Sequence, residues 1–109
     1  MPINYKVLGQ SNPAATTATT LYTVPAGTQA VVSTISVCNQ AATSGTYRIA
    51  IRVAGSALSA EEYIAFDSAI TANNTTFITV GITLNATDVI TVYASSATMS
   101  FNAFGSELS

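Results

Sequence analysis

Apolar and polar residues alternate along much of this chain, and the alternation predicts β-strands. Residues 46–53 give the clearest case, because Tyr47, Ile49, Ile51 and Val53 fall on one face while the residues between them fall on the other. No stretch repeats its apolar positions at the helical spacing of three and four residues. The pattern therefore indicates an all-β protein.

The chain is organised around residues 21–39, a short strand followed by a turn and a long strand. Pro25 stands near the first corner of the turn, where its fixed φ is useful, and Gly27 follows at a position that favours positive φ. Residues 30–38 are almost all Val, Ile, Thr and Ser, which suits a pleated sheet and disfavours a helix.

A second alternating run covers residues 76–84, where Ile78, Val80, Ile82 and Leu84 share a face. Turn residues separate such runs at regular spacing and give about eight strands. The predicted strands are residues 4–8, 20–24, 29–39, 46–53, 61–68, 76–84, 89–94 and 98–104, the last ending at Gly105.

This pattern predicts a single antiparallel β-sandwich, jelly-roll-like, with no significant helix. We expect one domain over residues 1–109, in which residues 1–19 form an N-terminal strand and an extended arm. A seven-stranded immunoglobulin-like sandwich is the alternative, but the chain lacks the Trp and the Cys pair of that fold.

Charged residues are few, and this narrows the function. They make up 7% of the 109 residues, against about 25% in average soluble domains. A net charge of −2 with three scattered cations argues against nucleic-acid binding. No apolar run is long enough for a membrane span, and no signal peptide for Sec export is evident. A surface so poor in charge protects weakly against self-association, so we expect an oligomer or a larger array.

The strand pattern also predicts one contact. If residues 46–53 and 61–68 pair antiparallel, burying Ile49 and Ile51 against Ile64 and Phe66 puts Arg48 opposite Asp67. The same register puts Arg52 near Tyr63, within diagonal reach of Glu61. We expect a small exposed cluster of ion pairs and cation–π contacts there.

Candidate catalytic and metal-binding residues are scarce. The chain has no His to act as a general base, and Glu61 and Glu62 would point to opposite faces of a strand. Asp67, Asp88 and Glu107 are isolated in the sequence, so a Ca²⁺ site would need many backbone ligands. We therefore expect no enzyme activity, no cofactor and no metal.

Other polar residues have structural interpretations. Cys38 lies among apolar residues and is expected to be buried and inert. Asn73, Asn74 and Asn85 begin glycosylation triplets, but without a secretory signal we interpret them as turn residues. Half-buried packing is the interpretation favoured for the tyrosines, with a sugar-stacking patch as the alternative. These tyrosines are Tyr5, Tyr22, Tyr47, Tyr63 and Tyr93.

The chain resembles small virion structural proteins of tailed bacteriophages, including marine and freshwater cyanophages. Residues 21–39, with the sequence Tyr-Thr-Val-Pro-Ala-Gly, carry the resemblance most clearly. Residues 46–53, 84–93 (with Asp-Val-Ile-Thr-Val) and 101–105 fit the same pattern, so the likeness spans most of the chain.

The resemblance implies a non-enzymatic building block, and we favour a capsid decoration or cement protein. Such a protein would assemble as a homotrimer, bind the major capsid protein and stabilise its lattice on the virion surface, after synthesis in the host cytoplasm. Residues 11–20 would lie along a neighbouring subunit. The alternatives are a tail, neck or fibre-associated virion module and a carbohydrate-binding β-sandwich.

Overall fold

Eight strands account for most of the chain in the computed structural model, which describes residues 3–109 except for the side chain of Val80. The predicted place of that side chain therefore lies outside the described residues, as do residues 1 and 2 of the predicted domain. The strands are β1 (Ile3–Ser11), β2 (Thr19–Thr23), β3 (Gln29–Asn39), β4 (Gly45–Arg52), β5 (Tyr63–Ile70), β6 (Thr75–Leu84), β7 (Val89–Ala94) and β8 (Met99–Leu108).

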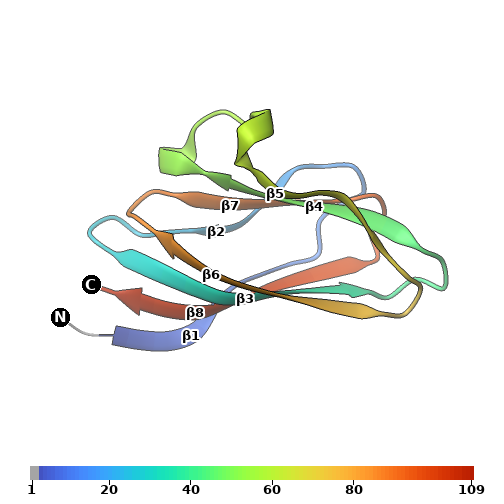
Figure 1. The fold of residues 1–109 in the computed structure, drawn as a ribbon, viewed down its shortest axis with the longest axis horizontal. Coiled ribbons are helices and arrows are strands. Elements are labelled where there is room, and N and C mark those ends of the chain that lie inside the picture. The colour runs from blue at the N-terminus through green and yellow to red at the C-terminus, as the bar shows by residue number, and fades with distance from the viewer. Residues whose placement is uncertain (1–2) are drawn as a thin grey trace.

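The strands form two antiparallel sheets that pack face to face (Figure 1). Sheet A has the order β1-β8-β3-β6, and sheet B has the order β2-β7-β4-β5. The predicted antiparallel β-sandwich is therefore confirmed. Two short 3₁₀ turns, η1 (Val53–Gly55) and η2 (Ala60–Glu62), lie in the β4–β5 connection. Within residues 3–109, no helix is long and apolar enough to cross a membrane.

The core lies between the sheets and consists of the inward-facing residues of both. Ile35 and Phe101 of sheet A and Ile49 of sheet B are fully buried. The Tyr47 and Phe101 rings join the sheets in an edge-to-face contact with centroids 6.3 Å apart. Each such side chain contributes about 1.5 to 3 kcal/mol by leaving water, so inter-sheet packing is the main stabilising term.

The predicted strands all occur, but only β3 and β7 have the predicted bounds. β5 begins and ends two residues later than predicted, so Glu61 and Glu62 lie in η2 and not in a strand. β1 is longer than expected at both ends, and β8 continues beyond Gly105 to Leu108. Gly105 does not end the strand: a Cβ there would lie 1.9 Å from the carbonyl oxygen of Val31. The close approach coincides with the break in register between Val32 and Thr34 of β3. Glycine is therefore needed here for space.

A turn forms before β3 with Gly27 at positive φ, as predicted, but Pro25 lies one position before the first corner and not at it. Thr28 N donates to Pro25 O at 3.2 Å, and Gly27 has a φ of 73°. The hydrogen bond makes Pro25 the first residue of the turn, so Ala26 and Gly27 occupy its centre. A non-glycine residue would be strained at that φ.

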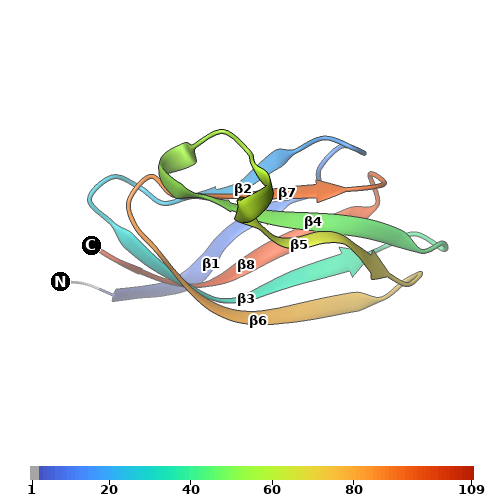
Figure 2. The same ribbon diagram turned by 45° about the horizontal axis from the view of Figure 1, so that its top comes forward.

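The residues of the predicted N-terminal strand and arm form β1 and a connection that is held on its own sandwich. After β1, the Asn12 side-chain amide donates to Met99 O at 2.6 Å. Thr16 N donates to Ala94 O at 2.8 Å, and Pro13 is buried. The segment between β1 and β2 therefore crosses from sheet A to sheet B and closes one end of the sandwich (Figure 2).

Replacing Gly105 should destabilise the protein strongly. We expect Gly105→Ala to lower the free energy of unfolding by about 3 kcal/mol or more, because the new methyl group collides with the β3 backbone. Gly27→Ala is the matched control, since nothing lies within 4 Å of a Cβ there and only its positive φ is strained. Its expected cost is about 1 kcal/mol. Urea denaturation measures both values, and equal costs would contradict the steric explanation.

Candidate functional site

The outer face of sheet B carries a cluster centred on Arg48. Its guanidinium donates to both carboxylate oxygens of Asp67, at 2.6 and 3.2 Å. The guanidinium carbon lies 4.1 Å from the ring centroid of Phe66 and 4.3 Å from that of Tyr93. The hydrogen bonds from Arg48 lower the pKa of Asp67. The predicted Arg48–Asp67 ion pair is confirmed. The cation–π contacts are those of Arg48 with Phe66 and Tyr93, not of Arg52 with Tyr63, and exposure to water keeps each contact weak.

The predicted burial of Ile64 and Phe66 is wrong. β4 and β5 are adjacent and antiparallel, but their register shifts on both sides of Ile49, which lies opposite Ala65. Asp67 has a φ of 50° near one of these shifts. The irregularity turns Phe66 outward, with 57% of its surface exposed, and leaves Ala65 to pack against the core.

Arg52 also differs from its predicted place beside Tyr63 and Glu61. Its guanidinium donates to the carbonyl oxygens of Ser56, at 2.6 Å, and Gly55, at 3.0 Å. η1 begins directly after β4 and returns the chain over this side chain. Arg52 therefore holds the start of a loop.

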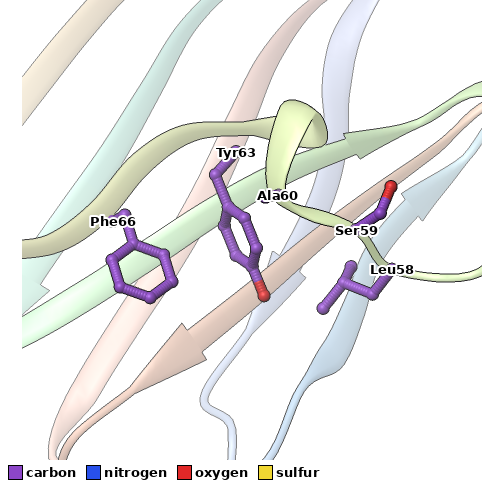
Figure 3. A pocket seen from close by; sticks show the side chains of 5 residues that line it. All are labelled: Leu58, Ser59, Ala60, Tyr63 and Phe66. Atoms are coloured by element: carbon purple, nitrogen blue, oxygen red, sulfur yellow. The ribbon is translucent and has the colours of Figure 1, made fainter.

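That loop, residues 53–62, projects from the sheet B side of the sandwich and contains both 3₁₀ turns (Figure 1). Between it and β5 lies an open pocket of about 560 Å³. The Tyr63 and Phe66 rings meet edge to face at 5.0 Å, and Tyr63 lies between Phe66 and Leu58 (Figure 3). Ser59 and Ala60 complete the pocket, which is mostly apolar with hydroxyl groups at its border.

The two adjacent glutamates stabilise this loop. Glu62 accepts from Ser59 N at 2.9 Å and from Ser56 Oγ at 2.6 Å. Glu61 accepts from Ser59 Oγ at 2.6 Å, and this hydrogen bond lowers the pKa of Glu61. Ser59 and Glu62 thus form a capping box for η2, and Glu61 holds the Ser59 hydroxyl beside it.

Asp88 anchors the other end of the loop. One carboxylate oxygen accepts from Ala54 N at 2.8 Å, and the other accepts from Asn85 N at 2.9 Å. The second bond closes the predicted turn between β6 and β7. Asp67, Asp88 and Glu107 do not meet, and among residues 3–109 no three His, Cys, Asp or Glu side chains could hold a metal ion together.

The outer face of sheet A is a larger surface of different character. Pairing in the sheet defines rows across it, including Tyr5, Ser106, Val31 and Thr83. Among the described side chains, this face carries no charge. Its other members are Ile3, Val7, Gln10, Gln29, Ser33, Thr34, Ser36, Cys38, Thr75, Phe77, Thr79, Ser100, Asn102, Phe104 and Leu108.

Exposed aromatic residues stand among these small polar side chains. Tyr5 is 83% exposed and Phe77 is 68% exposed, and Phe104 is also exposed. Four strands about 4.8 Å apart and five rows about 7 Å apart give a face of about 700 Å². That is close to the roughly 800 Å² that each partner buries in a typical specific interface. Aromatic residues without charge are typical of the centre of such interfaces.

The chain's charges are unevenly distributed. Three cationic and five acidic residues make eight in all. Asp88 lies in the β6–β7 turn, and Lys6 and Glu107 meet at the end of the sandwich. The other five lie on the outer side of sheet B or in the loop beside it; they are Arg48, Arg52, Glu61, Glu62 and Asp67.

Glu107 lies between the sheets with only 8% of its surface exposed. It accepts from Lys6 Nζ at 2.8 Å and from Tyr22 Oη at 2.5 Å. The bonds from Lys6 and then Tyr22 lower the pKa of Glu107. Burial, and then the contact with Glu107, raise the pKa of Tyr22. The network joins β1 and β8 of sheet A to β2 of sheet B.

The remaining candidates from the sequence are separated. Tyr22 and Tyr47 are buried, so the five tyrosines form no common patch. The predicted burial of Cys38 is wrong: it is partly exposed on the outer face of sheet A, because the neighbouring Val37 points into the core. Asn73 has a φ of 53° in a turn, as predicted for the triplet residues.

Comparison with known proteins adds no assignment: no family model, no curated protein and no solved structure matches this chain.

Protonation of Glu107 should weaken the fold. Folding lowers the pKa of Glu107, so its carboxylate stabilises the protein fully above about pH 4.3, the ordinary glutamate value. This stabilisation is lost as pH falls through the lowered pKa. We expect Glu107→Gln to cost about 1 to 2 kcal/mol at neutral pH and progressively less below about pH 4. Thermal unfolding of both proteins from neutral to acidic pH measures this.

Glu61→Gln is the control, because Glu61 lies on the exposed loop. Its effect on stability should stay small at every pH. A Glu107→Gln cost that did not change with pH would contradict the role of the charge.

Proposed function

We propose that this chain is a non-enzymatic virion structural protein that decorates the capsid as a cement protein. The observation that supports this most is the uncharged outer face of sheet A, with Tyr5, Phe77 and Phe104 exposed on it. A surface of Ser, Thr and aromatic residues can be covered by another protein without burying an unpaired charge. For a protein that stays monomeric, an uncharged face has no such benefit, because no partner covers it.

In this proposal the sheet A face lies on the major capsid protein, and sheet B, with its charged cluster, faces water. Each copy would cover a junction between neighbouring capsid proteins and stabilise the lattice through added contacts. The resemblance to phage virion proteins supports a homotrimer at the capsid surface, made in the host cytoplasm. No part of this role requires a catalytic group, a cofactor or a metal.

We further propose that the sandwich is a jelly roll. The pairs β1–β8, β2–β7, β3–β6 and β4–β5 are those of one long antiparallel hairpin. The additional pairs β3–β8 and β4–β7 are those gained when such a hairpin is wound into two sheets. This connectivity supports the proposal.

The copy number tests the role. A cement protein should be present in hundreds of copies per particle, since it covers repeated lattice positions, and quantitative mass spectrometry against the major capsid protein measures this. Cryo-electron microscopy of particles with and without the protein should give extra density at three-fold positions, lost in the deletion. A few copies per particle would instead support a tail, neck or fibre module.

The proposed contact face has its own test. We expect Tyr5→Glu to lower occupancy on the capsid by about tenfold or more, because the carboxylate would be buried against the capsid without a partner. Phe66→Glu is the matched control on sheet B, where an exposed aromatic residue also receives a charge. Equal losses, or a loss only in Phe66→Glu, would assign capsid binding to another surface.

A carbohydrate-binding sandwich is the second candidate, favoured by the pocket between Tyr63, Phe66 and Leu58. Aromatic faces beside hydroxyl groups suit the apolar faces of sugar rings. For this candidate the expected result is specific glycan binding by the isolated protein, lost in Tyr63→Ala and retained in Tyr5→Ala. Absence of binding across a broad glycan array would exclude a carbohydrate-binding function.

A further inference from the structure

Each sheet ends in two edge strands, and an edge strand presents backbone donors and acceptors that can pair with another strand. The edges are β1 and β6 in sheet A and β2 and β5 in sheet B. Proteins protect such edges with charges, prolines, bulges or short strands. The four edges of this sandwich can therefore be compared by how each is protected.

Three edges have such protection. β2 has only five residues and breaks its register against β7. β5 shifts register twice against β4 and carries the charged Asp67 at a φ of 50°. β1 carries Lys6 and shifts register between Val7 and Gly9. Gly9 also approaches Leu21 of β2 closely, so these two edges lie against each other.

β6 is different. It has ten residues, and none of them is charged or is a proline. Residues 75–79 pair with β3 without interruption, and the register breaks only between Thr79 and Ile82, where Gly81 has a φ of 61°. The part of this edge that has no charge, no proline and no register break is therefore residues 75–79, whose central residue is Phe77.

We propose that residues 75–79 pair antiparallel with the same segment of a second copy of this chain, about a two-fold axis at Phe77. The two A sheets would then form one continuous eight-stranded sheet, since each contributes four strands. Pairing satisfies backbone groups on both edges at once, which is the source of affinity in β-strand addition.

The composition of the segment fits a second copy. In this register the two Phe77 rings are direct cross-strand neighbours on the outer face, and such aromatic pairs stabilise sheets. On the inner side Thr76 lies opposite Ile78 of the second copy, and Ile78 is only partly buried in the single chain. No charge in the segment opposes the approach of an identical strand.

Between monomers a two-fold contact of this kind is closed, so the assembly stops at a pair. In a homotrimer each of the three subunits would present the same β6 edge, so the contact would join trimers to one another. In either case, disrupting it should return the assembly to the unjoined monomer or trimer. Capsid occupancy is a separate measurement, so the two proposals can fail separately.

Sedimentation velocity of the purified full chain tests the contact. We expect wild-type protein to associate as its concentration rises through the micromolar range, and Phe77→Lys to keep one lower mass at every concentration, because two like charges would meet at the axis. Tyr5→Lys is the matched control, since Tyr5 is an exposed aromatic residue on the same face but on the opposite edge. It should associate like the wild type. Wild-type protein that never associates, or equal effects of both variants, would overturn the proposal.

A cross-linking test does not depend on how well Phe77→Lys folds. Phe77→Cys in a Cys38→Ser background should form a disulfide-linked pair on mild oxidation. Opposite residues in an antiparallel pair have Cα atoms about 4.5 to 5.5 Å apart, within reach of a disulfide. Thr20→Cys on the β2 edge, in the same background, should remain unlinked. Association without the Phe77→Cys cross-link would place the contact elsewhere and overturn the proposal.

Discussion

The structure depends on the packing of two inner sheet faces against each other. Ile35, Ile49 and Phe101 are fully buried between the sheets, and each fixes the face of the strand to which it belongs. Because side chains alternate along a regular strand, the neighbours of such a residue point to the outer face of the sheet. The character of each outer face follows from that alternation.

The strands were predictable because alternation is a local property of the sequence. The Arg48–Asp67 contact was predictable for a related reason: its two strands are consecutive in the chain and pair directly. The predicted faces of Ile64 and Phe66 were wrong because a bulge shifts the alternation without changing the composition around it. Gly105 was misinterpreted in a similar way, since the backbone that approaches it belongs to a distant strand.

The candidate surfaces were harder to predict. Tyr22 and Glu107 are 85 residues apart, and nothing near either residue indicates the other. The outer face of sheet A draws on four strands from both ends of the chain, so it exists only once the strand order is known. One signal was present in the sequence. Lys6 adjoins Tyr5 in β1, and Glu107 lies three residues after Phe104 in β8, so alternation points each charge to the face opposite to that of the aromatic residue. Both charges therefore avoid the outer face.

In the proposed assembly the two outer faces have different surroundings, one covered by protein and one in water. A carboxylate or ammonium group that loses water without gaining a partner costs several kcal/mol, whereas a hydroxyl group costs far less and finds a hydrogen bond more easily. A face that must be covered therefore excludes charge, while a face that stays in water can hold all of it. The sheet A face and the β6 edge adjoin, because Phe77 belongs to both. Together they form one continuous uncharged surface, large enough for a partner on the face and a second copy at the edge. A sandwich that remained a free monomer would carry the aggregation risk of this surface without any compensating contact.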